Sequence, residues 1–465
     1  MSLSIDTLAF AYLVSATLFI LGLKGLTSPA TARRGSLQAI IGMVLAVTVT
    51  LMSPEIVSGY GLIAIAVIIG AAIGITVAIK IKMTAMPQLV AMLHSFVGLA
   101  AVLVAIGTFI NRELAGTLDS VLMGELAAGI VIGAITFTGS LIAFGKLQAL
   151  LSSAPVVFTG QHWLNLAIGI VTIAFAVHFG MTGSYFSLAI ITILSLALGF
   201  LLIIPIGGAD MPVVISMLNS YSGWAAAATG FTLQNNLLIV TGALVGFSGA
   251  ILSYIMCRAM NRSFISVILG GFGVAEGGDA SPLAAAAEKG VKAAGVEDAT
   301  FWMDNEGAKV IVIPGYGMAV AQAQHALKEV MEILTERGVS VKFAIHPVAG
   351  RMPGHMNVLL AEADIPYDYV QEMDEINPEF SSCDVALVVG ANDVTNPAAK
   401  IDKSSDIYGM PILDVEKAKQ IFVIKRSMRP GYAGVDNLLY YRDNCSMLFG
   451  DAKEVCEGLA GALKG

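Results

Sequence analysis

The sequence predicts a polytopic α-helical membrane bundle of nine spans, followed by an α/β domain built on a doubly wound parallel sheet. Of the 465 residues, 56% are hydrophobic and only 13% are charged, and ordinary soluble domains do not show that balance. The long apolar runs all lie in the first part of the chain. Beyond them, short β-branched runs alternate with helical patterns, which is typical of a parallel sheet.

Each apolar run is long enough to cross about 30 Å of hydrocarbon at about 1.5 Å per helical residue. The runs are rich in Gly, Ala, Ser and Thr, which favours close packing between helices. No basic residue precedes the first run, so it does not read as a signal peptide. The predicted spans are 5–23, 36–53, 59–79, 87–110, 121–145, 163–180, 184–205, 212–231 and 236–257.

The distribution of basic residues between the loops predicts the orientation. One set of alternate loops holds eight Lys and Arg residues, whereas the other set holds only Arg112. Because basic loops remain on the cytoplasmic side, we expect the N-terminus outside and the C-terminal domain in the cytoplasm. The membrane is expected to be the plasma membrane, which is the inner membrane of a bacterium. The eight residues are Lys24, Arg33, Arg34, Lys80, Lys82, Lys146, Arg258 and Arg262.

Composition changes along the chain and divides it into three parts. We predict a transmembrane domain over 1–262, a Gly/Ala/Pro-containing hinge or linker over 263–289, and an α/β domain over 290–465. Beyond Arg262 the chain has seventeen basic and twenty-eight acidic residues, so a nucleic-acid partner is not expected. The four cysteines are far apart and form no Cys-x-x-Cys pair, which indicates neither a metal site nor a disulfide framework.

In the α/β part, the carboxyl ends of the strands should meet at one edge and form a ligand crevice there. Polar, glycine-bearing loops follow several strands, at 314–317, 346–354, 390–396 and 425–437. The expected strands are 309–313, 339–345, 367–370, 384–389, 412–415 and 420–424, and the expected helices are 318–336, 353–363 and 452–463.

The loop after the first of these strands resembles a dinucleotide-binding turn. Gly315 and Gly317 permit a tight turn and close approach to a pyrophosphate, with the amides of a following helix facing the phosphates. Val320 stands where the third glycine of the usual pattern would be. Taken alone, the turn fits an ordinary strand-to-helix connection equally well; with the other loops it predicts a Rossmann-like site.

The charged residues around this crevice favour NADP over NAD. An NAD site usually places an acidic residue after its second strand, but here that strand ends in His346 and Pro347. Lys425, Arg426 and Ser427 follow a later strand and offer two cations and a hydroxyl to a 2′-phosphate. The alternative is that the two cations form only a solvated sheet edge.

Ionisable and polar residues inside the apolar spans are candidates for a proton path. His94 lies within the fourth span, where an imidazole is costly unless it has a function. Asn219 and Ser140 could extend a hydrogen-bonded path from it. The alternative for all three is hydrogen bonding between helices. Asp210 stands at the end of a span, where it could meet the soluble domain or cap the next helix.

These features together predict redox chemistry coupled to a proton gradient, with one reactant on another chain. The sequence has one dinucleotide-type domain and no flavin, haem, iron–sulfur or other metal-ligation pattern. A second polypeptide should therefore carry the other nucleotide. The alternative is an ion channel or transporter with a dinucleotide-sensing domain, although the sequence contains no acidic ring or carbonyl filter motif.

Nearly the whole chain resembles the β subunit of proton-translocating NAD(P) transhydrogenase. The resemblance implies an α-subunit partner that holds NAD(H), assembly as a dimer of αβ units in membrane lipid, and NADP(H) on this chain. It also implies direct hydride transfer between the nicotinamides, with NADPH formed as protons enter the cytoplasm. The segments that carry the resemblance are 91–102, 207–224, 239–261, 314–322, 346–363 and 425–434.

The resemblance also implies roles for individual residues. His94 corresponds to the proton-relay histidine, Asn219 to its polar neighbour, and Asp210 to the point where bundle and nucleotide domain communicate, while Ser248 and Gly249 affect that coupling. Asn392 and Asp393 lie near the nicotinamide, and Arg351 contacts a phosphate. The family's own glycine motif matches Gly315, Tyr316, Gly317, Ala319 and Val320, and the 2′-phosphate site with its covering loop matches Lys425, Arg426 and Tyr432. The nucleotide is expected to lie reversed relative to ordinary Rossmann enzymes, so the usual role of each glycine does not transfer.

Overall fold

The computed structural model describes residues 4–465, apart from 55, 57, 153–154, 261, 270–289, 404, 406 and 429–434. Most of the expected linker and Tyr432 therefore lie outside the described residues. Contacts within the chain define two compact units. The first comprises Met1–Ile142, Gly160–Leu201 and Met217–Ala250, and the second comprises Ala143–Thr159, Leu202–Ser216 and Ile251–Gly465.

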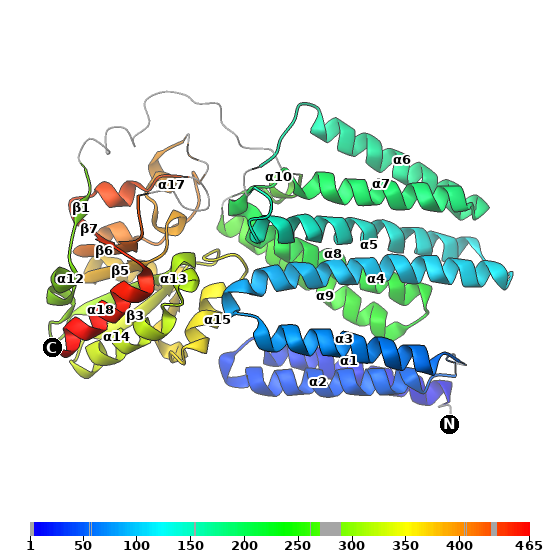
Figure 1. Ribbon diagram of the computed structural model, residues 1–465, viewed down its shortest axis with the longest axis horizontal. Coiled ribbons are helices and arrows are strands. Elements are labelled where there is room, and N and C mark those ends of the chain that lie inside the picture. The colour runs from blue at the N-terminus through cyan, green and yellow to red at the C-terminus, as the bar shows by residue number, and fades with distance from the viewer. Residues whose placement is uncertain are drawn as a thin grey trace. The chain divides into compact units, whose positions relative to one another are not determined.

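Each of the nine expected spans coincides with a long helix in the described part of the chain (Figure 1). Eight of these helices are long and apolar enough to cross a membrane, which confirms a membrane bundle. The remaining helix, α8, has 22 residues but is less apolar, so its span stays a prediction. The helices are α1 Ile5–Gly25, α2 Pro29–Leu51, α3 Tyr60–Lys80, α4 Met86–Leu114, α5 Ser120–Leu147, α6 Gln161–Thr182, α7 Tyr185–Ile203, α8 Met211–Thr232 and α9 Asn236–Ala259.

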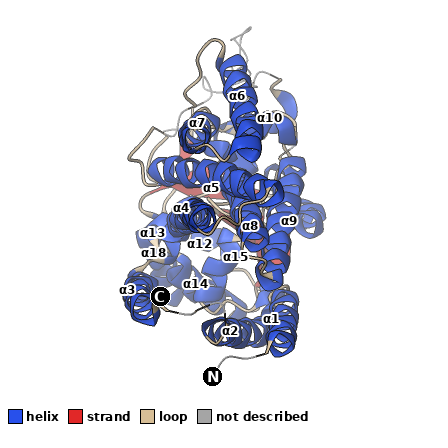
Figure 2. Ribbon diagram, turned by 90° about the vertical axis from the view of Figure 1, so that its right-hand side faces the viewer, coloured by secondary structure: helices blue, strands red, loops and turns tan. Residues whose placement is uncertain are grey.

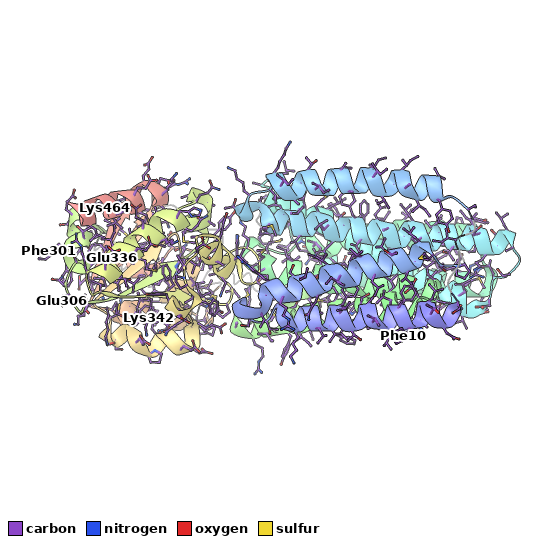
Figure 3. The ribbon with its side chains drawn as sticks, turned by 90° about the horizontal axis from the view of Figure 1, so that it is seen from below. Phe10, Phe301, Glu306, Glu336, Lys342 and Lys464 are labelled. Atoms are coloured by element: carbon purple, nitrogen blue, oxygen red, sulfur yellow. The ribbon has the colours of Figure 1, made fainter. Side chains whose placement is uncertain are left out.

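Glycines allow several of these helices, seen nearly end-on in Figure 2, to pack backbone against backbone. A Cβ atom on Gly98 of α4 would lie 2.5 Å from the Gly133 carbonyl oxygen of α5. A Cβ atom on Gly223 of α8 would likewise overlap the backbone of α9 at Gly246. Large apolar side chains such as Phe10 instead point outward from the helices, as lipid-facing side chains do (Figure 3).

The second unit contains a seven-stranded sheet in which every neighbouring pair is parallel. The strand order is β1-β7-β6-β5-β2-β3-β4, so the chain runs outward from β2 in one direction and restarts at β5 in the other. This reversal beside β2 is the topological switch point at which doubly wound sheets bind ligands. The strands are β1 Lys292–Ala293, β2 Lys309–Pro314, β3 Ser340–Ile345, β4 Val370–Glu372, β5 Val385–Val389, β6 Gln420–Lys425 and β7 Cys445–Phe449.

Buried side chains on both faces of the sheet form the core of the α/β part. Ile311 and Ile313 belong to one buried cluster, while Val310 and Val312 point to the opposite face because side chains alternate along a strand. On that face, α14 contributes an apolar stripe with helical spacing. The helices of this part are α10 Phe264–Leu269, α12 Val296–Met303, α13 Tyr316–Ala321, α14 Gln324–Glu336, α15 His355–Glu362, α16 Met373–Ile376, α17 Ala398–Ile401 and α18 Ala452–Lys464.

Two of the expected strands differ in the structure. The expected strand over 412–415 is wrong, because the segment forms a loop that leads into the 3-10 turn Val415–Lys417. Among the described residues, its amides do not form hydrogen bonds with a neighbouring strand. The Leu413 amide donates to the Val394 carbonyl, and the Asp414 amide donates to Asn377 Oδ1. The strand expected over 367–370 begins only at Val370, after a 3-10 turn that follows Pro366.

The single helix expected over 318–336 is two helices. Gln322 has a left-handed backbone (φ 54°), which ends α13 before α14 begins. The strands β1 and β7 were not expected from the sequence. β1 has only two residues, and β7 is a short mixed run whose strand character depends on pairing with β6.

Candidate functional site

The loops after β2 and β5 meet at the switch point through glycine backbone. The Gly317 amide donates to the Gly390 carbonyl at 2.9 Å, and a Cβ atom on Gly317 would lie 2.7 Å from Gly390 Cα. Gly390 itself has φ 66°, a conformation that favours glycine. The expectation that Gly315 and Gly317 permit close approach of a pyrophosphate stays a prediction; the structure adds that Gly317 and Gly390 lie against each other and that the Gly317 amide is bonded to the Gly390 carbonyl.

A cavity of about 430 Å³ opens at this edge of the sheet, a size typical of small-molecule sites. All four polar loops expected at the strand ends contribute to its wall. Ala319 is buried beneath the turn and, like Arg351, is not among the residues of the wall. The predicted site residues that line the cavity are Gly315, Tyr316, Gly317, Val320, Asn392, Asp393, Lys425, Arg426 and Ser427.

Lys425 and Arg426 give one end of the cavity its positive charge. The Lys425 Nζ lies 4.8 Å from the centre of the Tyr440 ring. Burial lowers the pKa of Lys425 from its ordinary value, while the nearby carboxylates of Asp436 and Asp393 act to raise it. Arg426 is exposed and forms a 2.8 Å ion pair with Asp451, the N-cap residue of α18.

Asn392 follows β5 and is held on several sides. Its Oδ1 accepts a 2.7 Å hydrogen bond from the Tyr440 hydroxyl, and its carbonyl accepts from Asn437 Nδ2 at 3.0 Å. The Thr395 hydroxyl also donates to the Asn392 carbonyl, at 2.9 Å. These bonds fix the loop that carries Asn392 and Asp393 at the cavity wall.

Arg351, Tyr316 and His355 stack beside the cavity. The Arg351 guanidinium lies 4.1 Å from the centre of the Tyr316 ring, within the range of a cation–π contact. The Arg351 amide donates to His355 Nδ1 at 3.1 Å. Burial, assisted by the Arg351 charge, lowers the pKa of His355 to about 4, so this histidine is neutral at pH 7. Tyr316 thus presents a fixed aromatic surface at the start of α13.

The end of β3 has no carboxylate that could bind a ribose 2′-hydroxyl. His346 is buried there, and its Nε2 donates to the Pro411 carbonyl at 2.8 Å. Its Nδ1 accepts from the Val348 amide at 3.2 Å. Burial lowers the pKa of His346 to about 4, against a smaller opposing effect of the Pro411 carbonyl. A neutral, fully bonded histidine therefore stands where an NAD site has an acid.

In the first unit, His94 is connected to α8 through Ser222. The Ser222 hydroxyl donates to the Asn219 carbonyl at 2.7 Å and lies 3.1 Å from His94 Nδ1. While the Ser222 hydroxyl makes that bond it can only accept from Nδ1, and a neutral imidazole then carries its hydrogen on Nδ1. His94 Nε2 is buried and has no hydrogen-bond partner among the described residues. The structure thus brings His94 and the Asn219 backbone together.

Ser140 and Asp210 occupy other positions. Ser140 on α5 is fully buried, and its hydroxyl has no hydrogen-bond partner in the part of the chain that the structure describes. Asp210 ends a 3-10 turn directly before α8, and both of its carboxylate oxygens lie 2.8 Å from Arg262 Nη1. This ion pair connects the start of α8 to the segment that follows α9.

Three residues around these sites were missed in the sequence. Ser222 lies three residues after Asn219, so helical spacing places both on one face of α8 and could have identified it. Tyr440 and Asp451 gave no such signal, because their contacts to Asn392 and Arg426 depend on the folded sheet. In the described residues, no group of three or more His, Cys, Asp or Glu side chains could hold a metal ion.

Comparison with known proteins gives consistent matches over almost the full length. A family model described as "NAD(P) transhydrogenase beta subunit" matches residues 8–462. The NAD(P) transhydrogenase subunit beta of Rhodospirillum rubrum is 59% identical over 458 residues, which cover 97% of this chain and 98% of that protein. A sequence of the same name from a defined strain of that organism matches with the same identity and coverage.

Proposed function

Because the chain belongs to the NAD(P) transhydrogenase beta-subunit family, we propose that it binds NADP(H) and couples hydride exchange with NAD(H) to proton movement. A beta subunit implies an alpha-subunit partner, and we place NAD(H) on that partner. The proposed units are a transmembrane domain over 1–262, a linker over 263–289 and an NADP(H) domain over 290–465. The αβ units would form dimers in the bacterial inner membrane, with the NADP(H) domain in the cytoplasm and the N-terminus outside.

The observation that carries the NADP(H) assignment is the charge around the cavity. Lys425 and Arg426 stand at the end of β6, while the end of β3 holds neutral His346. A 2′-phosphate fits the two cations and the Ser427 hydroxyl, because charge-assisted hydrogen bonds favour a dianion. Arg426 would weaken its ion pair with Asp451 in order to bind the phosphate. Tyr432, which lies outside the described residues, is proposed from the sequence as the residue that covers the bound nucleotide.

The remaining site residues position the nucleotide for transfer. Arg351 on its Tyr316 platform suits a pyrophosphate, and Asn392 with Asp393 suits the nicotinamide end. The turn at Gly315, with Ala319 and Val320, supports these loops. Hydride transfer from NADH to NADP+ moves two electrons and a proton directly between the nicotinamides and yields NAD+ and NADPH. No protein acid or base is required, so these residues act by orientation and exclusion of water.

In the membrane, His94 is the proposed proton carrier. Ser222 and the Asn219 carbonyl hold its Nδ1, which leaves Nε2 as the atom that gains and loses a proton. The buried Ser140 hydroxyl would extend the path. The ion pair of Asp210 with Arg262, together with Ser248 and Gly249 on α9, would transmit the state of the nucleotide domain. Proton entry into the cytoplasm would then favour NADPH formation.

The nucleotide assignment can be tested by measuring NADP+ and NAD+ binding to the purified chain. The wild type should bind NADP+ more tightly, and Lys425→Ala should weaken NADP+ binding by roughly ten- to a hundredfold, because a charged hydrogen bond contributes about 1.5–3 kcal/mol. Lys309→Gln, at the opposite edge of the sheet, is the matched control. Tighter binding of NAD+ by the wild type would contradict the assignment.

The proton assignment requires the chain and its alpha partner reconstituted in sealed vesicles. His94→Ala should greatly slow the proton-coupled reaction, because the variant lacks the group proposed to carry the proton. Coupled rates equal to those of the wild type would remove His94 from the path.

A further inference from the structure

We propose that Tyr440 is a positioning residue of the nucleotide site, with its ring holding the Lys425 ammonium group and its hydroxyl holding Asn392. One buried side chain would then set both the 2′-phosphate end and the nicotinamide end of bound NADP(H). This inference rests on the proposed NADP(H) function and adds a residue that neither the glycine turn nor the cation pair contains.

Tyr440 lies behind the cavity wall, in the 3-10 turn Leu438–Tyr441, and is 2% exposed. Its hydroxyl donates a 2.7 Å hydrogen bond to Asn392 Oδ1. Burial raises the pKa of Tyr440 well above its ordinary value of 10, so the hydroxyl keeps its hydrogen at any working pH. The bond therefore has one direction, and it orients the side-chain amide of Asn392 by occupying its oxygen.

The ring of Tyr440 acts on Lys425. The Nζ lies 4.8 Å from the ring centre, inside the roughly 6 Å range in which an ammonium group is attracted to an aromatic face. Lys425 is half-buried, and burial disfavours its charge. The ring offsets part of that effect and limits the positions that a flexible four-carbon side chain can take. The Lys425 ammonium group is thereby positioned at the cavity wall to bind the 2′-phosphate.

A second asparagine holds Tyr440 in place. Asn437 is 1% exposed, and its Nδ2 donates to the Asn392 carbonyl at 3.0 Å and lies 3.3 Å from Thr395 Oγ1. Its Oδ1 accepts from the Leu439 amide at 2.9 Å. The turn that carries Tyr440 and the loop that carries Asn392 are thus bonded as one piece, so that movement at one end of the site is passed to the other.

The opposing interpretation is that Tyr440 only fills the core and satisfies its hydroxyl on the nearest oxygen. A core residue would change stability, and any effect on nucleotide binding to this chain would be the same for NADP+ and NAD+. A positioning residue instead separates the two ends: the ring affects affinity for the 2′-phosphate, and the hydroxyl affects the rate of hydride exchange.

The experiment compares Tyr440→Phe and Tyr440→Leu in the chain assembled with its alpha partner, with Tyr441→Phe as the control on the adjacent tyrosine. Tyr440→Phe keeps the ring, so NADP+ affinity should stay within about threefold while hydride exchange slows by roughly three- to tenfold, the value of one hydrogen bond. Tyr440→Leu should weaken NADP+ binding by roughly three- to thirtyfold and, measured on the purified chain without its partner, leave NAD+ binding unchanged.

A double-mutant cycle with Lys425→Met separates this inference from the proposed function. If Tyr440 acts through Lys425, the losses in NADP+ affinity will not add. If Lys425→Met removes the preference for NADP+ but Tyr440→Leu does not, the inference fails while the function stands. If the wild type itself shows no preference, the proposed function fails. Should Tyr440→Leu not fold, an unchanged exchange rate in Tyr440→Phe still overturns the inference.

Discussion

One side chain, Asp384, forms hydrogen bonds with residues at the starts of neighbouring strands. Asp384 stands directly before β5, where its Oδ2 accepts from the Lys309 amide at 2.9 Å and its Oδ1 accepts from Lys419 Nζ at 2.7 Å. The Lys419 hydrogen bond, followed by the Lys309 amide, lowers the pKa of Asp384 from its ordinary value of 3.8. One carboxylate thus ties the starts of β2, β5 and β6 together.

Asp384→Asn should destabilise the α/β domain by about 1 kcal/mol at pH 7, the net value of one charge-assisted bond at a partly exposed site. A lowered folded-state pKa stabilises the protein above the ordinary carboxyl pKa, and this contribution is lost as pH falls through the folded-state value. The difference from wild type should therefore be constant near neutrality and shrink below about pH 4. Amide hydrogen exchange in β2 and β5, followed as a function of pH, measures this difference in stability. Asp368→Asn, at an exposed position, is the control. A stability difference that stays constant below about pH 4 would contradict the role given to the Asp384 carboxylate.

At the scale of elements, the loops after β2 and β5 pack without side chains between them. Gly390→Ala would place a Cβ atom against Gly317 Cα and the Met318 amide in a left-handed backbone. Gly307 has a similar φ, 79°, but a Cβ atom there meets nothing within 4 Å. Gly307→Ala should thus cost only the backbone strain of about 1–2 kcal/mol.

Gly390→Ala should destabilise the protein by roughly 1–3 kcal/mol more than Gly307→Ala, because the new Cβ atom overlaps backbone atoms that cannot move aside. It should also weaken nucleotide binding. Thermal unfolding and NADP+ titration of both variants check this prediction. Equal destabilisation by the two variants would show that only strain matters at Gly390.

The contact between α4 and α5 can be tested in the same way. Gly98 is one helical turn from His94, and a Cβ atom there would lie 2.5 Å from the Gly133 carbonyl oxygen and 2.7 Å from the Phe137 nitrogen. Gly98→Ala should push α4 away from α5 and slow the proton-coupled reaction by roughly tenfold, since overpacking costs about 1–3 kcal/mol. NADP+ affinity should not change. Gly107→Ala, on the same helix with open space around it, should behave as wild type in vesicle assays.

At the scale of the whole molecule, the predicted orientation can be tested with cysteine labelling. All four natural cysteines are buried, so an impermeant maleimide should give little background. Ala115→Cys lies in the loop after α4, and Glu306→Cys lies in the α/β part (Figure 3). In intact cells only Ala115→Cys should react, and Glu306→Cys should react after lysis. The reverse result would invert the topology.

Much of the fold could be predicted because periodicity and length are local properties of the sequence. The helices around His94 and the strands β2, β3, β5 and β6 followed from such patterns. Features that depend on distant partners could not be predicted. The segment 412–415 has strand-like residues but finds its hydrogen bonds on Val394 and Asn377, and the helix over 318–336 breaks at Gln322 without a glycine or proline to announce it. The same reason explains why Tyr440 was missed at the candidate site.

The hydrogen bond that ties His94 to Ser222 also limits how a proton could travel. A histidine in a proton wire receives at one ring nitrogen and releases at the other. If the Ser222 hydroxyl keeps its hydrogen bond to the Asn219 carbonyl, Nδ1 keeps its own hydrogen and Nε2 is the only His94 nitrogen left to exchange a proton in the proposed path. The same nitrogen must then face first one side of the membrane and then the other. Net transport would require alternating access, and a continuous water chain through His94 would not be sufficient.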